Sequence, residues 1–157
     1  MQRSMKMFLL SISLTLWNFT TWASGEREPF FPEIEGQRME YTVTLDFGRA
    51  HFSGICIMKC LHGEIVGTLM NEFGLRAFDI RYNPHRGRVM LTNLLDLLDR
   101  WYIRKTLHRD LKLLLQNGDP EAPLKLRGRR IERLDDGSLS LNHIRRGLNL
   151  RFTPLNR

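Results

Sequence analysis

The sequence predicts an α+β fold in which a strongly curved antiparallel sheet, an open half-barrel of about eight strands, packs on one long or two consecutive α-helices. Apolar and polar residues alternate with period two over most of residues 41–91 and 124–152, as in half-buried strands. Between these regions the apolar residues recur at the spacing of a helix. Short turns separate successive strands, which favours antiparallel meanders. A helix and a sheet that each have one apolar face bury those faces against each other.

Five strands are expected before the helix. An irregular lead-in, residues 26–38, contains several prolines and glutamates, and alternation begins after it, from Tyr41 to Phe47. The remaining four strands are expected at about 50–60, 64–70, 75–82 and 88–91. The turns between them contain glycine, and the strongest turn signal is residues 83–87, NPHRG.

One long helix or two consecutive helices are expected from residue 94 to about residue 115. Asn93, with Asp96 three residues later, resembles a capping box. Apolar residues then follow one helical face, and residues 117–120, NGDP, form a stop signal. The polar residues 104–106 interrupt the apolar face, which leaves a bend or a break as an alternative. A helix of about 22 residues would be roughly 33 Å long.

About three strands are expected after Pro123. Apolar residues alternate with polar ones from Leu124 to Leu134, and residues 135–137, DDG, predict a hairpin turn. The alternation continues over about 139–143 and, after a turn at Arg146-Gly147, over about 148–152.

Residues 1–23 have the composition of a secretory signal peptide, which leaves residues 24–157 as a single domain. Arg3 and Lys6 precede an apolar run over residues 7–17, and small residues follow at 23–25. The run is shorter than the roughly 20 residues that span a bilayer. A buried N-terminal helix and an uncleaved membrane anchor are the alternatives. We therefore expect an exported protein that is periplasmic or associated with the outer membrane.

Composition and motifs argue against catalysis. The 157 residues include only two cysteines, too few for a disulfide scaffold or a four-cysteine zinc site. Cys56 and Cys60 are expected on one strand with about 13 Å between their Cα atoms, which is too far for a disulfide. His51 and His62 flank them, but this spacing matches no standard zinc pattern. Nucleophile and phosphate-loop motifs are lacking, so we expect no catalytic residue, no cofactor and no metal.

Positive charge concentrates near the C-terminus. The whole chain has a formal net charge of +7, and residues 124–157 contain nine basic and three acidic side chains. We expect one strand face to carry four of the basic residues and to contact an anionic surface such as lipid headgroups: Lys125, Arg127, Arg129 and Arg133. The alternative is a solvated outer face whose charges protect an edge strand. Phe152 is the only aromatic residue of this segment, which argues against nucleic acid as a partner.

Two segments carry a resemblance to a known group of proteins. Residues 69–80, LMNEFGLRAFDI, and residues 105–115, KTLHRDLKLLL, resemble uncharacterised bacterial envelope proteins and lipoproteins. These are similar in layout to the lipoprotein carrier and receptor pair (LolA/LolB-like), whose curved antiparallel sheet wraps helices and encloses an apolar cavity. The resemblance covers about residues 40–116 and implies no catalytic residue. The sequence departs from a lipoprotein in lacking a cysteine at the signal exit, and it is shorter than the carriers.

An apolar groove between the sheet and the helix is the candidate ligand site. Pockets of this kind bind small apolar ligands in many proteins. The groove is expected to be lined by inward-facing strand residues and by the helix: Phe52, Met58, Leu69, Phe78, Ile80, Trp101, Leu107 and Leu111. A filled core made of the same residues is the alternative.

The leading functional prediction is a non-catalytic cell-envelope protein that binds a lipid, a lipidated chain or another apolar ligand. Its expected partners are a lipid or lipoprotein and an anionic membrane surface. One alternative is a structural or adaptor protein that docks at the outer membrane through the basic C-terminal strands. The other is an envelope hydrolase with a site around His51, His62 or His85.

Overall fold

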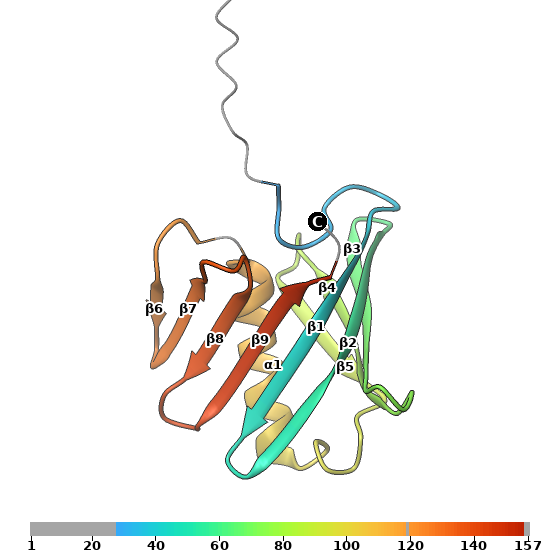
Figure 1. The fold of residues 1–157 in the computed structure, drawn as a ribbon. Coiled ribbons are helices and arrows are strands. Elements are labelled where there is room, and N and C mark those ends of the chain that lie inside the picture. The colour runs from blue at the N-terminus through green and yellow to red at the C-terminus, as the bar shows by residue number, and fades with distance from the viewer. Residues whose placement is uncertain (1–27, 119, 156–157) are drawn as a thin grey trace, which may run out of the picture.

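The computed structural model describes residues 28–118 and 120–155. In these residues nine strands form a single antiparallel sheet, and one helix follows the fifth strand (Figure 1). The strands are β1 (Arg38–Phe47), β2 (Ala50–Leu61), β3 (Glu64–Met70), β4 (Arg76–Asn83), β5 (Arg88–Thr92), β6 (Leu124–Leu126), β7 (Arg129–Arg133), β8 (Leu139–His143) and β9 (Leu148–Pro154). The helix α1 comprises Trp101–Gln116. The predicted signal peptide, residues 1–23, lies outside the described residues.

The predicted open half-barrel of about eight strands on one long or two consecutive helices is wrong. The described residues form a single nine-stranded sheet with one helix of 16 residues. At 1.5 Å per residue this helix is about 24 Å long, well short of the length expected from the apolar pattern.

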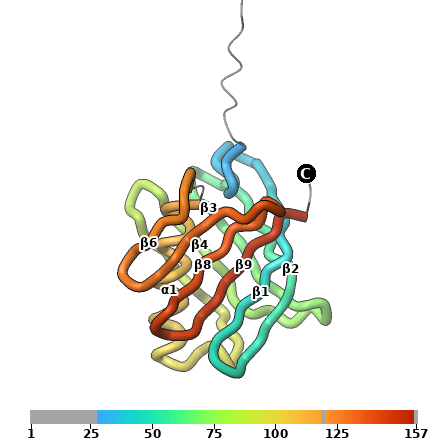
Figure 2. The backbone as a smooth tube through the Cα atoms, turned by 60° about the vertical axis from the view of Figure 1, so that its left-hand side comes forward, coloured from blue at the N-terminus to red at the C-terminus, as the bar shows by residue number. Residues whose placement is uncertain are grey.

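The sheet consists of two meanders joined through the first and last strands. The strand order is β5-β4-β3-β2-β1-β9-β8-β7-β6, with every neighbouring pair antiparallel. Figure 2 shows β9 running between β1 and β8. The pairing of β1 with β9 runs without a break from Tyr41 opposite Pro154 to Phe47 opposite Leu148. The connection that carries α1 therefore spans the region between the two edge strands, β5 and β6.

The helix begins at Trp101 because the preceding residues are held in a turn. Asn93 adopts a left-handed backbone conformation with φ of 52°, and its side-chain amide donates to Asp79 Oδ2 at 2.6 Å instead of capping a helix. The N–H of Leu95 donates to the carbonyl of Ala77 at 2.8 Å, which attaches the turn to β4. The apolar spacing over residues 94–98 thus comes from packing of a turn, in which Leu98 is buried.

The sheet has one strand more than predicted because a tight turn divides residues 124–133. Arg127 and Gly128 both have positive φ, 48° and 79°, and Leu126 pairs with Arg129 across them. Positive φ at both central positions is the geometry of a type I′ hairpin turn. The same pattern, a residue followed by glycine, predicted the turn at residues 146–147, so the signal was present in the sequence.

The core lies between one face of the sheet and α1, and the lead-in completes it. The largest fully buried side chains include Tyr41, Phe78 and Phe152 from the sheet. Phe30 and Phe31 precede the first strand, yet both are buried against Tyr41, whose hydroxyl donates to the carbonyl of Phe30 at 2.6 Å. The lead-in is irregular, as expected, but its aromatic residues belong to the core.

Candidate functional site

The residues expected to line an apolar groove lie mostly in the packed core. Six are at most 2% exposed: Met58, Leu69, Phe78, Ile80, Leu107 and Leu111. Phe52 is half-buried and packs against them, whereas Trp101 is 76% exposed. The space in which the groove was expected, between the sheet and the helix, is therefore occupied by these side chains themselves.

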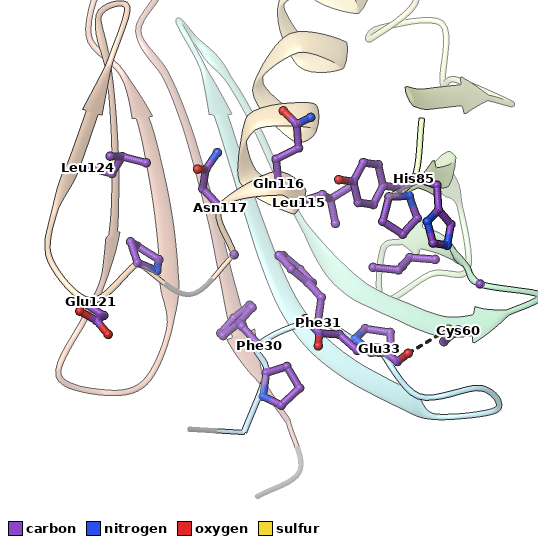
Figure 3. A pocket seen from close by; sticks show the side chains of 18 of the residues that line it. Phe30, Phe31, Glu33, Cys60, His85, Leu115, Gln116, Asn117, Glu121 and Leu124 are labelled. Carbon is purple, nitrogen blue, oxygen red and sulfur yellow. Dashed lines mark hydrogen bonds between the residues drawn. The ribbon is translucent and has the colours of Figure 1, made fainter. Parts of the chain in front are cut away.

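A pocket of about 830 Å³ lies instead at the C-terminal end of α1 (Figure 3). We call it the end pocket. Its lining is largely aromatic, aliphatic and proline: Pro29, Phe30, Phe31, Pro32, Ile65, Tyr82, Pro84, Leu115, Pro120, Ala122 and Leu124. Figure 3 shows Phe31 and Leu115 beside the pocket, with His85 at another side. These residues come from the lead-in, the last turn of the helix and the connection between β4 and β5.

Close packing of the lead-in against the helix end shapes the end pocket. The helix stops at Gln116, as the Asn117-Gly118 pair predicted. A Cβ atom at Gly118 would lie 2.6 Å from the ring of Phe31, so glycine allows the chain after the helix to approach the lead-in. Leu115, in the last helical turn, is 7% exposed and contributes to the same wall.

Polar contacts attach the lead-in to the turn between β2 and β3 beside the end pocket. The carboxylate of Glu35 accepts from the backbone N–H groups of His62 and Gly63, at 3.0 and 3.3 Å. The hydrogen bond from His62 lowers the pKa of Glu35. The thiol of Cys60 donates to the carbonyl of Glu33 at 3.6 Å. These contacts hold the lead-in, which carries Phe30 and Phe31, against the β2–β3 turn at one side of the pocket.

The four basic residues expected on one strand face do not share it. The two-residue turn at Arg127-Gly128 makes Leu126 the partner of Arg129, and paired residues of neighbouring strands point to the same face. An odd-numbered residue of β6 therefore shares its face with an even-numbered residue of β7. Lys125 therefore points to the outer face with its partner Arg130. Arg129 and Arg133 are odd-numbered residues of β7, so they point to the opposite, inner face together with the buried Ile131.

Arg129 joins a different set of basic residues, which lies along α1. Two adjoining hollows of about 370 and 570 Å³ share Arg109, Arg127 and Arg129 among their lining residues. We call the two together the basic groove. Its basic side chains besides His143 come from the helix, from the start of β7 and from the β6–β7 and β8–β9 turns: Lys105, Arg109, Lys112, Arg127, Arg129, Arg145 and Arg146. Trp101 and Tyr102 line its end at the start of the helix.

A buried carboxylate lies beneath the basic groove. Asp110 is fully buried on α1, where Oδ1 accepts from Nε of Arg129 and Oδ2 lies 2.9 Å from Nδ1 of His143. Asp110 was not among the site residues predicted from the sequence. Asp110 lies between Leu107 and Leu111 on the apolar face of the helix, and an acidic residue at that position indicates a buried ion pair.

The two cysteines and His51 do not gather at one site. Cys56 is fully buried on β2, and burial raises the pKa of its thiol to about 12. Cys56 and Cys60 are both free, as the predicted strand required. His51 lies 2.5 Å from Asp46 on the neighbouring strand. Among residues 28–118 and 120–155, no group of three or more His, Cys, Asp and Glu side chains is arranged to hold a metal ion.

Comparison with known proteins adds no assignment. The sequence matches no protein-family model, and a search of the curated proteins finds no match.

Within the part of the chain that the structure describes, the helix is neither long nor apolar enough to cross a membrane.

Proposed function

We propose that the protein is an exported, non-catalytic cell-envelope protein that binds a lipid or a lipidated chain in the end pocket. The observation that carries this proposal is the pocket of about 830 Å³ with its aromatic, aliphatic and proline lining. Sites for small ligands typically have volumes of about 300–1,000 Å³ and similar linings, with a few polar groups that orient the ligand.

The apolar lining favours a hydrocarbon chain as the bound group. Phe31, Tyr82 and Leu115 line the pocket from three separate parts of the chain. Each CH₂ group that moves from water into such a lining contributes about 0.8 kcal/mol. A chain of several CH₂ groups would therefore supply most of the binding free energy.

Polar residues at the edge of the pocket are suited to the polar end of the same ligand. Gln116 and Asn117 follow the apolar wall at the end of the helix, and His85 and Glu121 lie at other sides of the opening. Gln116 also lines the basic groove, so the polar end of a bound molecule would lie towards that surface. This arrangement suits an amphipathic lipid better than a pure hydrocarbon.

Binding of a pyrene-labelled fatty alcohol tests the proposal, because this probe has no charge for the basic residues to attract. Ala122 is exposed at the pocket, so Ala122→Trp should place an indole ring in the opening and weaken binding by at least about tenfold. Ala50→Trp adds the same ring at the start of β2, away from the pocket, and should leave binding unchanged. Absence of binding, or equal binding by the two variants, would overturn the proposal.

A further inference from the structure

The basic groove concentrates positive charge along one side of α1. It contains seven Lys and Arg side chains, and none of its described lining residues is acidic. Asp110, the carboxylate beneath it, is fully buried and is engaged by Arg129 and His143. The cations at the surface of the groove therefore retain an unbalanced positive charge, which attracts anions.

The backbone presents these cations in a defined arrangement. Lys105, Arg109 and Lys112 follow one another at four- and three-residue intervals, so they lie on one side of the helix over about 10 Å. The N–H of Ile144 donates to the carbonyl of Gly128 at 3.1 Å, which joins the β8–β9 turn to the β6–β7 turn. The helix and the two turns thus form opposite walls that both carry positive charge.

Large apolar side chains are exposed in the groove or next to its lining residues. Trp101 lines the groove and is 76% exposed. Ile144 is 70% exposed and lies in sequence between His143 and Arg145, which both line the groove. Tryptophan is enriched where proteins meet the headgroup layer of a membrane, and exposed aliphatic residues can enter its hydrocarbon boundary.

We propose that this surface docks the protein on a membrane rich in anionic phospholipid. Headgroup phosphates would bind in the basic groove, while the side chains of Trp101 and Ile144 enter the interface. The exposed aliphatic Ile144 favours a lipid surface, because its side chain can enter the hydrocarbon boundary of a membrane but provides no ring on which a base can stack. The exposed ring of Trp101 is suited to either partner. The proposal does not depend on the end pocket, which lies at the C-terminal end of the helix.

Cosedimentation with vesicles of phosphatidylcholine, with and without phosphatidylglycerol, tests the proposal on the protein purified from its own cells. Wild-type protein should bind the anionic vesicles, and binding should fall as salt is added because the charges are screened. The double variant Arg109→Glu/Arg145→Glu should lower the partition coefficient by at least about tenfold, since each basic residue near an anionic surface contributes about 1 kcal/mol. Both residues are exposed, so the variant should keep the wild-type melting temperature.

The matched control is the double variant Arg86→Glu/Lys125→Glu. These residues are also exposed, they lie outside the groove, and the net charge of the protein changes by the same amount. This control should bind the anionic vesicles within about twofold of wild type. Equal losses in the two double variants would show that only the total charge matters and would overturn the proposed surface.

Substitution of the apolar residues separates a membrane surface from a soluble anion. Trp101→Ser and Ile144→Ser should each weaken vesicle binding while leaving its dependence on salt unchanged, because they remove insertion and not charge. Unchanged vesicle binding in both variants would overturn the role of these residues. Tighter binding to single-stranded DNA or inorganic phosphate than to anionic vesicles, at equal phosphate concentration, would overturn the proposed lipid partner.

Discussion

Asp110 on α1 accepts a hydrogen bond from Nδ1 of His143 at the end of β8, with 2.9 Å between the two atoms. Its other carboxylate oxygen accepts from Arg129 on β7. On another side of the same helix, Nε2 of His108 lies 2.8 Å from the carbonyl of Val89 on β5. The helix is therefore attached to both meanders of the sheet through polar contacts as well as through its apolar face.

Removing the carboxylate of Asp110 should destabilise the fold strongly. The side chains of Arg129 and His143 are nearly buried, and in Asp110→Ala both would lose their shared partner. Breaking a buried ion pair in this way costs about 3–5 kcal/mol. Chemical denaturation measures the free energy of unfolding. Asp99→Ala removes a carboxylate from the exposed pair with Arg104 and should cost less than about 1 kcal/mol. A loss at Asp110 no larger than that at Asp99 would contradict this assignment.

Two positions on α1 should differ sharply in their effect on stability. Leu111 is fully buried, so Leu111→Ala should lower the free energy of unfolding by about 2–5 kcal/mol. Trp101 is 76% exposed, so Trp101→Ala should change it by no more than about 0.5 kcal/mol. Urea denaturation of both variants checks this difference. A large loss at Trp101 would mean that its ring is buried in solution.

The sequence predicted the strands well because alternation directly reflects which face of a strand is buried. Seven of the nine strands, β1–β5, β8 and β9, lie within a few residues of their predicted positions. The pattern failed where a local contact overrides periodicity. Asn93 directly follows β5, has a left-handed backbone conformation and donates a side-chain hydrogen bond to Asp79. The apolar residues over 94–98 therefore belong to a turn and not to the start of the helix.

The candidate sites were harder to predict because they depend on contacts between distant segments. The end pocket is formed by the lead-in, two strand connections and the helix end. The periodicity of residues within one element does not show which distant segments lie side by side. The two-residue turn at Arg127-Gly128 places Lys125 and Arg129 on opposite faces of the sheet, although the glycine that indicates this turn is visible in the sequence. Lys105, Arg109 and Lys112 have helical spacing, but only the fold places them opposite the two basic turns.

Acid should loosen the attachment of the lead-in through Glu35. Hydrogen bonds from the backbone N–H groups of His62 and Gly63 lower the pKa of Glu35 below its ordinary value of 4.5. A carboxyl group whose pKa is lower in the folded state contributes stability above its unfolded pKa and loses that contribution as the pH falls through the folded pKa. Hydrogen exchange of residues 28–37 should therefore accelerate as the pH decreases below about 4.5, after correction for the intrinsic rate. Glu35→Gln should reduce this acid dependence, and the exposed Glu72→Gln should not.

Gly118 should be sensitive to a single added methyl group. In Gly118→Ala the new Cβ would lie 2.6 Å from the ring of Phe31, so the ring must move, and overpacking of this kind costs about 1–3 kcal/mol. Because Phe31 lines the end pocket, binding of the pyrene-labelled fatty alcohol should change as well. The double variant Gly118→Ala/Phe31→Leu should recover part of the stability, since leucine lacks the ring atoms in contact. Additive losses in the double variant would contradict this explanation.

Arg127 should show a conflict between stability and membrane binding. Its φ of 48° precedes that of 79° at Gly128, and asparagine followed by glycine is the preferred pair for such a turn. Arg127→Asn should therefore raise the free energy of unfolding by about 1 kcal/mol, because asparagine tolerates the left-handed conformation better than arginine does. Arg127 also lines the basic groove, so the same variant should bind anionic vesicles about fivefold more weakly, as expected from one lost positive charge.

His62 provides the matched control for this prediction. It has φ of 53° and precedes Gly63 with φ of 71°, so His62→Asn should bring a similar gain in stability. His62 lies outside the basic groove, in the turn between β2 and β3, and its substitution should leave vesicle binding unchanged. Denaturation and cosedimentation of the two variants separate the conformation of the turn from the charge of the arginine. If Arg127→Asn gained stability and kept full vesicle binding, the groove would hold phosphate without Arg127.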